Sequence, residues 1–438
     1  MKGIFYFFNA VMIASMALFS ACSKSGSNEA APKTNGPVIS SISVNQGSFQ
    51  TQVVINGSGF GANINDNLVY FNGELAIVDF AGTQQLTVEV PLGAGTGNIT
   101  ISVNNGPVVV GPKFTYVPSA IVSTFVGGDP LYPFVDGQGT VASLGYTPGL
   151  TIDHAGNFYT TDLNNHAIRK ITPSGYVSTI FRQAIALYFG DNCDFHALAV
   201  DNLGNVYATD TYHHTIVRIT PSGDTSTFAG NGHAINADGA LLQASFAYPN
   251  GIVIDNNNTM YITDQTTNTI RKISNGFVST LAGGNPGASD GMGTAASFHN
   301  PTGIVIGNDG NLYIADTGNN LIRRVTPQGA VTTIAGSGSS ASINGIGTKA
   351  SFFSPFSITE DKNGNFYVGE YGPTNTYIRK IAPDGTVTTF AGNGDTGAFN
   401  GPGSQATFNY PASMVFDQSG GLFIADFYNG LVRKILTE

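Results

Sequence analysis

The stretch PTGIVIGNDGNLYIAD, residues 301–316, decides the fold. It contains an apolar segment at 304–306, a polar turn that ends at Gly310, and a second apolar segment that ends in the carboxylate of Asp316. Gly most readily adopts the positive φ that the last position of such a turn requires. The stretch therefore predicts a β-hairpin whose second strand ends in an acidic residue.

This hairpin recurs about every 53 residues, and a carboxylate follows nine residues after the first residue of each turn. The turns lie at 153–156, 201–204, 255–258, 307–310, 361–364 and 417–420. The carboxylates are Asp162, Asp210, Asp264, Asp316, Glu370 and Asp426. A basic strand like IRRV at 322–325 follows in each copy. In every copy but the last it is followed by a strand like VTTIAG at 331–336. Four strands per repeat predict the blades of a β-propeller.

A strand of the fourth type, residues 121–126, precedes the first copy, whereas the last copy stops at Glu438 after three strands. We expect the early strand to complete the last blade, because closure of the ring hides free strand edges. The sequence thus predicts an all-β chain with a closed six-bladed propeller over residues 120–438. The copies, above all 301–316, resemble NHL repeats throughout this range.

Residues 37–117 show alternation of period two in short segments separated by Gly and Asn, which predicts a sandwich of two sheets. The segments VINGSGFG at 54–61, VYFNG at 69–73 and GNI at 97–99 resemble an IPT/TIG domain, which is immunoglobulin-like. The resemblance implies a spacer or a dimerisation module. We interpret this domain as a stalk, since it offers no cluster of His or carboxylates.

The first residues resemble a bacterial lipoprotein signal. Lys2 is followed by an apolar stretch at 4–19, by Ser-Ala-Cys ending at Cys22, and by a polar segment; Phe19 stands where such signals usually have Leu. The resemblance implies a signal peptide at 1–21, a lipidated Cys22 and a flexible tether at 22–36. An ordinary secretory signal and a membrane span are the alternatives. We expect a lipid-anchored protein of the bacterial cell envelope, at the outer membrane, facing the periplasm or the surface.

Charged residues make up 11% of the 438 residues and the formal net charge is −10. This charge would repel a phosphate backbone, and no cluster of Lys and Arg forms a stripe for one, so nucleic acid is excluded as a partner. If Cys22 carries lipid, Cys193 has no disulfide partner, and we interpret it as an inert small side chain.

The repeated carboxylates could form a ring of cation ligands or could be structural. We favour structure: each would accept backbone N–H bonds and pair with the Arg of its own blade. The segments between blades, such as 290–298, end in a Phe that we expect to fill the space between neighbouring blades. No metal or cofactor is expected.

Departures from the repeat indicate the candidate site, because the architecture does not demand them. Strand polarity places the tight Gly turns on one face of the propeller and the longer loops on the other, hereafter the long-loop face. We expect exposed aromatic side chains to gather there, with His196 near the mouth of the central channel. The candidate ligand-binding residues are Tyr188, Asp191, His196, Tyr212, His213, Tyr371, Tyr377 and Tyr428. Packing of these aromatics on adjacent loops is the alternative.

Tyrosines with Asp and Asn neighbours suit stacking on sugar rings or anchoring a protein. We therefore expect a non-catalytic envelope lipoprotein that binds a glycan or protein partner through its long-loop face, with the membrane contacted only through lipid. Two alternatives stay open: a propeller enzyme of the metal-dependent lyase or lactonase kind, and a structural assembly protein.

Overall fold

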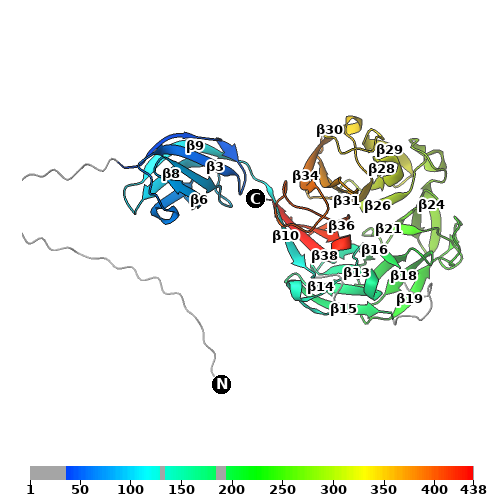
Figure 1. Cartoon of the computed structure of the whole chain (residues 1–438). Coiled ribbons are helices and arrows are strands. Elements are labelled where there is room, and N and C mark those ends of the chain that lie inside the picture. The colour runs from blue at the N-terminus through cyan, green and yellow to red at the C-terminus, as the bar shows by residue number, and fades with distance from the viewer. Residues whose placement is uncertain (1–35, 129–133, 184–193, 438) are drawn as a thin grey trace, which may run out of the picture.

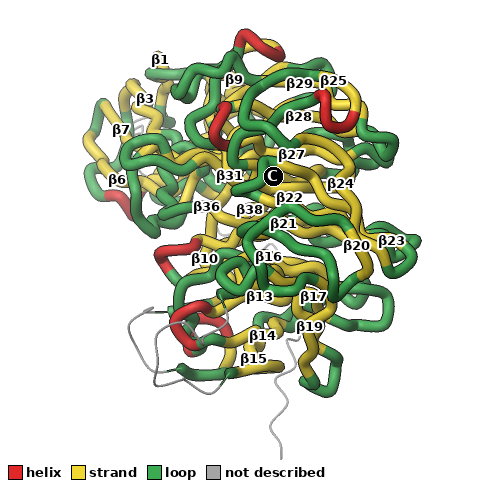
Figure 2. The backbone as a smooth tube through the Cα atoms, turned by 90° about the vertical axis from the view of Figure 1, so that its right-hand side faces the viewer, coloured by secondary structure: helices red, strands yellow, loops and turns green. Residues whose placement is uncertain are grey.

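The computed structural model describes residues 36–128, 134–183 and 194–437. It shows a β-sandwich followed by six sheets arranged as a ring (Figure 1), which confirms the predicted all-β fold class. Helix is confined, within these ranges, to short 3-10 turns in the loops at strand ends (Figure 2). The predicted lipoprotein signal and Cys22 lie outside the described residues, as does Cys193.

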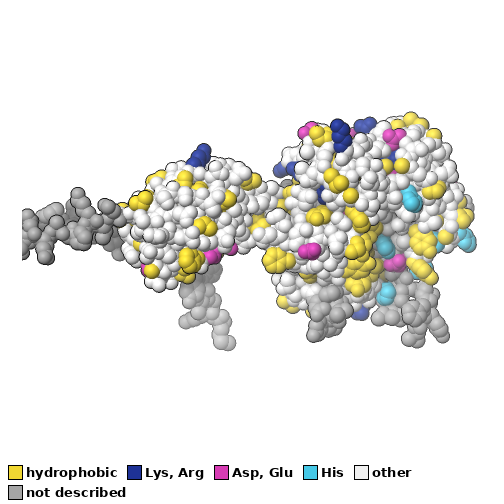
Figure 3. All heavy atoms as spheres, turned by 45° about the horizontal axis from the view of Figure 1, so that its top comes forward, with side chains coloured by type: hydrophobic (Ala, Val, Ile, Leu, Met, Phe, Trp, Pro, Cys, Tyr) yellow, Lys and Arg dark blue, Asp and Glu magenta, His cyan; other side chains and the backbone are white. Residues whose placement is uncertain are grey.

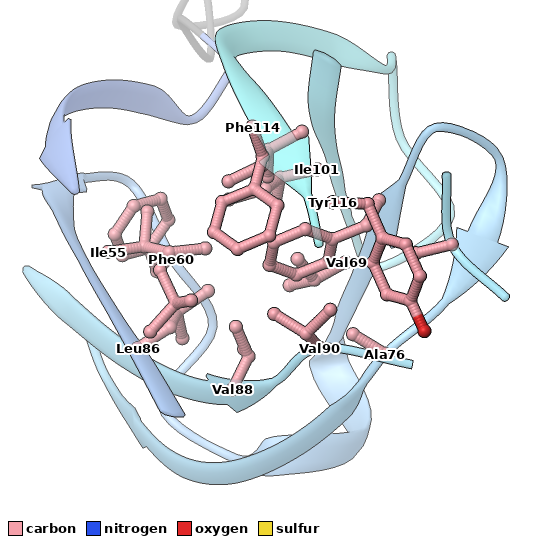
Figure 4. Close-up of a cluster of buried hydrophobic side chains, with 14 residues drawn as sticks. Ile55, Phe60, Val69, Ala76, Leu86, Val88, Val90, Ile101, Phe114 and Tyr116 are labelled. Atoms are coloured by element: carbon pink, nitrogen blue, oxygen red, sulfur yellow. The ribbon is translucent and has the colours of Figure 1, made fainter. Parts of the chain in front are cut away.

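The sandwich consists of two sheets that enclose one apolar core. The first sheet has the order β1 (Val38–Ile42), β3 (Gln52–Ser58), β7 (Gln85–Glu89), β6 (Ile77–Gly82). The second has the order β2 (Gln46–Gly47), β9 (Val109–Tyr116), β8 (Gly97–Val103), β4 (Asn67–Phe71), β5 (Glu74–Leu75), with η1 (Ile64–Asp66) before β4. Alternate side chains point inward, so that Ile55 and Leu86 of one sheet share the core with Val69, Ile101 and Phe114 of the other (Figure 4).

Each propeller blade is an antiparallel sheet whose first strand lies innermost. Blade one contains β12 (Leu150–Ile152), β13 (Phe158–Asp162), β14 (Ala167–Ile171), β15 (Tyr176–Arg182) and the outer β11 (Gly137–Gln138). Blade two contains β16 (Phe195–Val200), β17 (Val206–Asp210), β18 (Thr215–Ile219) and β19 (Thr225–Ala229). Blade three contains β21 (Pro249–Ile254), β22 (Met260–Asp264), β23 (Thr269–Ser274), β24 (Phe277–Gly283) and the outer β20 (Gly239–Ala240).

The remaining blades follow the same order. Blade four contains β26 (Pro301–Ile306), β27 (Leu312–Asp316), β28 (Leu321–Val325), β29 (Ala330–Ala335) and the outer β25 (Gly291–Met292). Blade five contains β31 (Pro355–Glu360), β32 (Phe366–Glu370), β33 (Thr376–Ile381), β34 (Thr386–Gly394) and the outer β30 (Gly345–Ile346). Blade six contains β36 (Pro411–Phe416), β37 (Leu422–Asp426), β38 (Leu431–Thr437), β10 (Ala120–Val126) and the outer β35 (Gly401–Pro402). The 3-10 turns of the propeller are η2 (Gly139–Val141), η3 (Leu163–Asn165), η4 (Gly293–Ala295), η5 (Thr317–Asn319), η6 (Gly347–Lys349) and η7 (Phe427–Asn429).

The early strand closes the ring as predicted. β10 pairs antiparallel with β38, with Val122 opposite Ile435 and Ser123 opposite Lys434. Val122 is 1% exposed and packs into the core shared by blades five and six. The two strands are separated by more than 300 positions of chain, so their pairing joins the ends of the propeller without a covalent bond.

A buried arginine joins strands two and three of a blade to the segment that precedes the blade. In blade four, Arg323 is fully buried; its Nη1 donates to Asp316 Oδ2 at 2.8 Å and to the carbonyl oxygen of Ser297, and its Nη2 donates to Asp290 at 2.8 Å. Phe298 is also fully buried, with its ring centroid 5.2 Å from the guanidinium. The carboxylates are therefore structural in such blades, and the Phe fills the space predicted for it.

Five blades share this arrangement. The paired residues are Arg169 with Asp162, Arg271 with Asp264, Arg323 with Asp316, Arg379 with Glu370, and Arg433 with Asp426. Blade two corrects the prediction that every carboxylate pairs with an Arg of its own blade. Val217 occupies the position of the buried Arg, and Asp210 instead accepts a hydrogen bond from His213 Nδ1 at 2.9 Å.

The hairpin turns are held by their first Asp. Asp361 accepts backbone N–H bonds from Asn363 and Asn365 at 2.9 Å and a bond from the Tyr367 hydroxyl at 3.2 Å. Partial burial alone would raise the pKa of Asp361, but these hydrogen bonds outweigh it and lower the pKa; the same holds for Asp153. The ionised carboxylate is thus the form that the fold stabilises.

We predict that Val122→Ala lowers the free energy of unfolding of the propeller by about 2 kcal/mol, because it leaves a cavity where the ring closes. Urea-induced unfolding followed by circular dichroism measures this. Ser123→Ala, on the exposed side of β10, is the control and should change stability by less than about 0.5 kcal/mol. Equal effects of both substitutions would contradict the closure argument.

Arg323→Met should destabilise the propeller by about 3–5 kcal/mol, because it leaves the buried carboxylate of Asp316 without its cation. Arg324→Met changes the neighbouring, half-buried arginine of the same strand and serves as the control. The same urea titration compares the two. A smaller loss for Arg323→Met than for Arg324→Met would show that the buried pair does not hold the blade together.

Acid should destabilise the protein through the turn carboxylates. Because their pKa values are lowered on folding, the stability they contribute is present above the ordinary Asp pKa and is lost as pH falls through the lower, folded pKa. We predict that the urea midpoint of the wild type falls from pH 5 to pH 3 more steeply than that of the Asp153→Asn, Asp361→Asn double variant. Parallel pH profiles would refute this.

Candidate functional site

The residues that precede the innermost strands form a rim on the long-loop face. The carbonyl oxygen of each rim residue accepts a hydrogen bond from the N–H that follows the terminal carboxylate of its blade, which makes the positions equivalent. The bonds are Leu163 N to Tyr146 O (2.9 Å), Thr211 N to Asp194 O (3.0 Å), Gln265 N to Tyr248 O (3.2 Å) and Phe427 N to Tyr410 O (3.0 Å). Three of these four blades thus present a tyrosine at the rim.

Two rim tyrosines have strained backbones. Tyr248 has φ +60° and Tyr410 has φ +73°, and each precedes a proline. An L-residue other than Asn or Asp rarely adopts positive φ, and a following Pro further restricts the backbone. Asn300 (φ +50°) and Ser354 (φ +42°) occupy the equivalent positions of blades four and five, also before a proline, so the positive φ belongs to the architecture of the blades.

Aromatic side chains pack together over blades five, six and one; we call Tyr146, Tyr371, Tyr410, Phe427 and Tyr428 the tyrosine cluster. The ring centroid of Tyr410 lies 4.0 Å from that of Tyr371 and 5.7 Å from that of Tyr428, onto which it stacks. Tyr146 reaches the same group, 5.3 Å from Tyr428. Tyr428 is 37% exposed, so the cluster keeps an open surface. Figure 3 shows contiguous patches of apolar and aromatic side chains on the propeller, with His side chains beside them.

The hydroxyls of Tyr410 and Tyr428 stay protonated at neutral pH. Burial raises the pKa of Tyr410, and so do the neighbouring Tyr428 and Tyr371 hydroxyls. Burial, together with Tyr371, also raises the pKa of Tyr428. Neutral hydroxyls can donate as well as accept hydrogen bonds, which suits polar ligands with many hydroxyl groups.

Acidic and imidazole groups occupy the next part of the rim, over blade two. Asp194 lies 3.5 Å from His196 Nε2. Burial alone would raise the pKa of Asp194, but the hydrogen bond from His196 and the nearby imidazoles outweigh it and lower the pKa. His214 packs edge-on against Tyr248 at 4.8 Å, and burial lowers its pKa, so its ring is neutral at pH 7.

The central channel contains a cavity of about 340 Å³ lined by the innermost strands of all six blades. His196 and Asn250 line it together with apolar side chains such as Ile252, Phe356 and Met414. His196, which was expected near the mouth of the channel, is thus one of the residues that line it. Polar residues such as Asp153, Asp201 and Asp255 also line the cavity, so its wall is both polar and apolar.

The predicted site residues divide into separate groups. Tyr371 and Tyr428 meet in the tyrosine cluster, whereas Tyr212 and His213 lie over blade two, with ring centroids 5.5 Å apart. Tyr377 packs beside Gly394 instead. Tyr188 and Asp191 lie outside the described residues.

The sequence analysis missed Tyr146, Tyr248 and Tyr410. The signal was available in part, because Tyr-Pro at 248–249 and at 410–411 aligns with Asn-Pro at 300–301 in the repeat. That alignment would have placed these tyrosines at the rim.

Neither a metal site nor a membrane-spanning helix is supported in the part of the chain that the structure describes. No group of three or more His, Cys, Asp or Glu side chains there could hold a metal ion. Nor does any helix within the described ranges have the length and apolar character needed to cross a membrane.

Comparisons with known proteins agree with this architecture. The IPT/TIG domain model matches residues 37–116, and the NHL repeat model matches residues 298–324. The protein SUPPRESSOR OF QUENCHING 1, chloroplastic, of Arabidopsis thaliana is 32% identical over 168 residues, which is 35% of this chain. The match spans only 16% of that relative's length.

Two solved structures share the whole arrangement of the described chain. An auxiliary nutrient binding protein from Bacteroides thetaiotaomicron has a TM-score of 0.67 at 21% identity, and one from Bacteroides ovatus has a TM-score of 0.56 at 20% identity. Each alignment covers 93% of this chain and 99% of the other. At such identities the likeness establishes the fold and nothing finer. The protein therefore joins an IPT/TIG domain to a six-bladed propeller that contains an NHL repeat.

Proposed function

We propose that this protein is a non-catalytic binding protein of the bacterial cell envelope that takes a glycan or protein partner on the long-loop face of its propeller. The observation that carries the proposal is the tyrosine cluster, whose rings remain open at Tyr428. Aromatic rings with neutral hydroxyls bind sugars by stacking and hydrogen bonding, and they also anchor protein partners.

The domain organisation fits the same proposal. Residues 1–21 would be a lipoprotein signal, Cys22 the lipidated residue and 22–36 a tether; the IPT/TIG domain, residues 37–117, would act as a stalk for the propeller at 120–438. The Bacteroides proteins of the same fold, described as auxiliary nutrient binding proteins, support a binding role. A lipid anchor followed by a stalk would hold the long-loop face away from the membrane.

The tyrosine cluster should bind polysaccharide in native affinity electrophoresis. We predict that the chain from Gly36 to Glu438 is retarded in a gel containing at least one polysaccharide of a broad panel. The Tyr371→Ala, Tyr428→Ala variant should need at least about tenfold more polysaccharide for equal retardation, because it removes the open stacking surface.

Tyr176→Ala is the matched control, since Tyr176 is 48% exposed on the outer part of blade one and lies outside the cluster. It should be retarded like the wild type. Retardation that survives in the double variant would place glycan binding elsewhere. Free migration of the wild type with every polysaccharide would reject a glycan in favour of a protein partner.

A further inference from the structure

Blade two departs from its five sister blades at one buried position. Strand three carries Arg169, Arg271, Arg323, Arg379 or Arg433 in the sister blades, each fully buried. Val217 takes this position in β18, opposite Ala208 of β17, as Arg323 lies opposite Ile314 in blade four. Blade two thus lacks the guanidinium that the rest of the propeller uses.

The carboxylate that would hold this guanidinium is still present and buried. Asp210 is 3% exposed, as its counterparts are. Its Oδ1 accepts hydrogen bonds from His213 Nδ1 at 2.9 Å and from the backbone N–H groups of His213 and Asp194 at 3.3 Å. Its Oδ2 accepts no hydrogen bond from any described residue, whereas the equivalent oxygen of Asp316 accepts a hydrogen bond from Arg323 Nη1 at 2.8 Å. This oxygen is not among the buried side-chain atoms without a partner, so it is accessible, and a cation that reaches it would gain a charge-assisted hydrogen bond.

A cavity opens beside this oxygen. It has a volume of about 930 Å³, and its lining includes Asp210, Val217, Phe195, Tyr212 and Tyr248. Val217 is half-buried, whereas the sister arginines are fully covered, and no described side chain takes the place of the guanidinium. Aromatic walls provide π faces on which a planar cation can stack.

We propose that the blade-two cavity binds the guanidinium group of an arginine side chain presented by a partner protein. The sister blades show which cation suits the carboxylate, since Arg433 and Asp426 meet at 2.8 Å in the same place. A metal ion is disfavoured, because within the described ranges no third His, Cys, Asp or Glu joins such a site. The nearby carboxylate of Asp194 and the net charge of −10 add attraction for a basic partner.

The inference goes beyond the proposed function, because the cavity lies apart from the tyrosine cluster and can bind whether or not that cluster takes a glycan. The probe is Nα-acetyl-L-argininamide, and saturation-transfer NMR on the chain from Gly36 to Glu438 detects it. We expect saturation of its side-chain methylenes with a dissociation constant on the order of millimolar, as for one charge-assisted contact. Nα-acetyl-L-citrullinamide, which has the same shape without the charge, should bind at least about tenfold more weakly.

Val217→Arg is the decisive variant, because it supplies the guanidinium that five sister blades already contain. It should weaken probe binding at least about tenfold while the circular dichroism spectrum stays native. Ser123→Arg adds the same charge on exposed β10 and should bind the probe like the wild type. Asp210→Asn should also lose the probe, and the Tyr371→Ala, Tyr428→Ala variant should keep it.

Three results would overturn the inference. These are the absence of saturation transfer with wild type, equal binding of the citrulline analogue, and unchanged binding in Val217→Arg. Loss of polysaccharide retardation with retained probe binding would reject the glycan proposal alone. Loss of probe binding with retained retardation would reject the guanidinium site alone.

Discussion

The propeller depends on a buried ion pair that occurs in five of its six blades. The guanidinium of Arg323 bonds at once to strand two through Asp316, to the preceding segment through Asp290, and to a backbone carbonyl. Burying both charges is costly, so a lone buried pair is weak evidence of stability. The value of the arrangement is geometric: one rigid planar donor ties a strand end to the segment that arrives from the preceding blade, with a buried Phe beneath it. The buried pairs therefore fix the strand ends beneath the rim residues of the long-loop face.

Closure of the ring also fixes the two ends of the propeller, because β10 pairs with β38. β10 follows the sandwich directly in the chain and completes blade six, where it pairs with β38 on one side and with β35 on the other. The rim then brings blades five, six and one next to one another, which allows Tyr146 and Tyr428 to meet although they lie at opposite ends of the repeat series. Blade two gives the rim a different chemistry, because there His213 takes one oxygen of the carboxylate and Val217 leaves the other without a guanidinium.

The blades were predictable in number and order because their signals are local. A turn that needs positive φ, an apolar segment of period two and a carboxylate at constant spacing can all be found in a short window. The pairing of Asp316 with Arg323 followed from the same repeat. The exception at blade two was visible in the sequence, because Val217 aligns with the arginines of the other blades. That Asp210 Oδ2 is left without a hydrogen bond from a described residue, however, cannot be inferred from residue spacing. Tyr371 and Tyr428 were found as departures from the repeat, whereas Tyr410 was missed: its only signal is the alignment of Tyr-Pro at 410–411 with Asn-Pro at 300–301, and the structure marks the position by a backbone bond from Phe427.

By itself, then, the sequence determined the two kinds of domain, the six repeats, the closing strand and the fully buried Phe side chains between blades, since each depends on contacts that recur at a regular interval. Only the tertiary structure decided which side chains share a surface. Tyr146 and Tyr428 meet because the ring closes, and Asp210 faces a cavity because Val217 is shorter than the arginines of the sister blades. Such contacts join residues far apart in the chain, and their distances depend on the packing of all six blades at once.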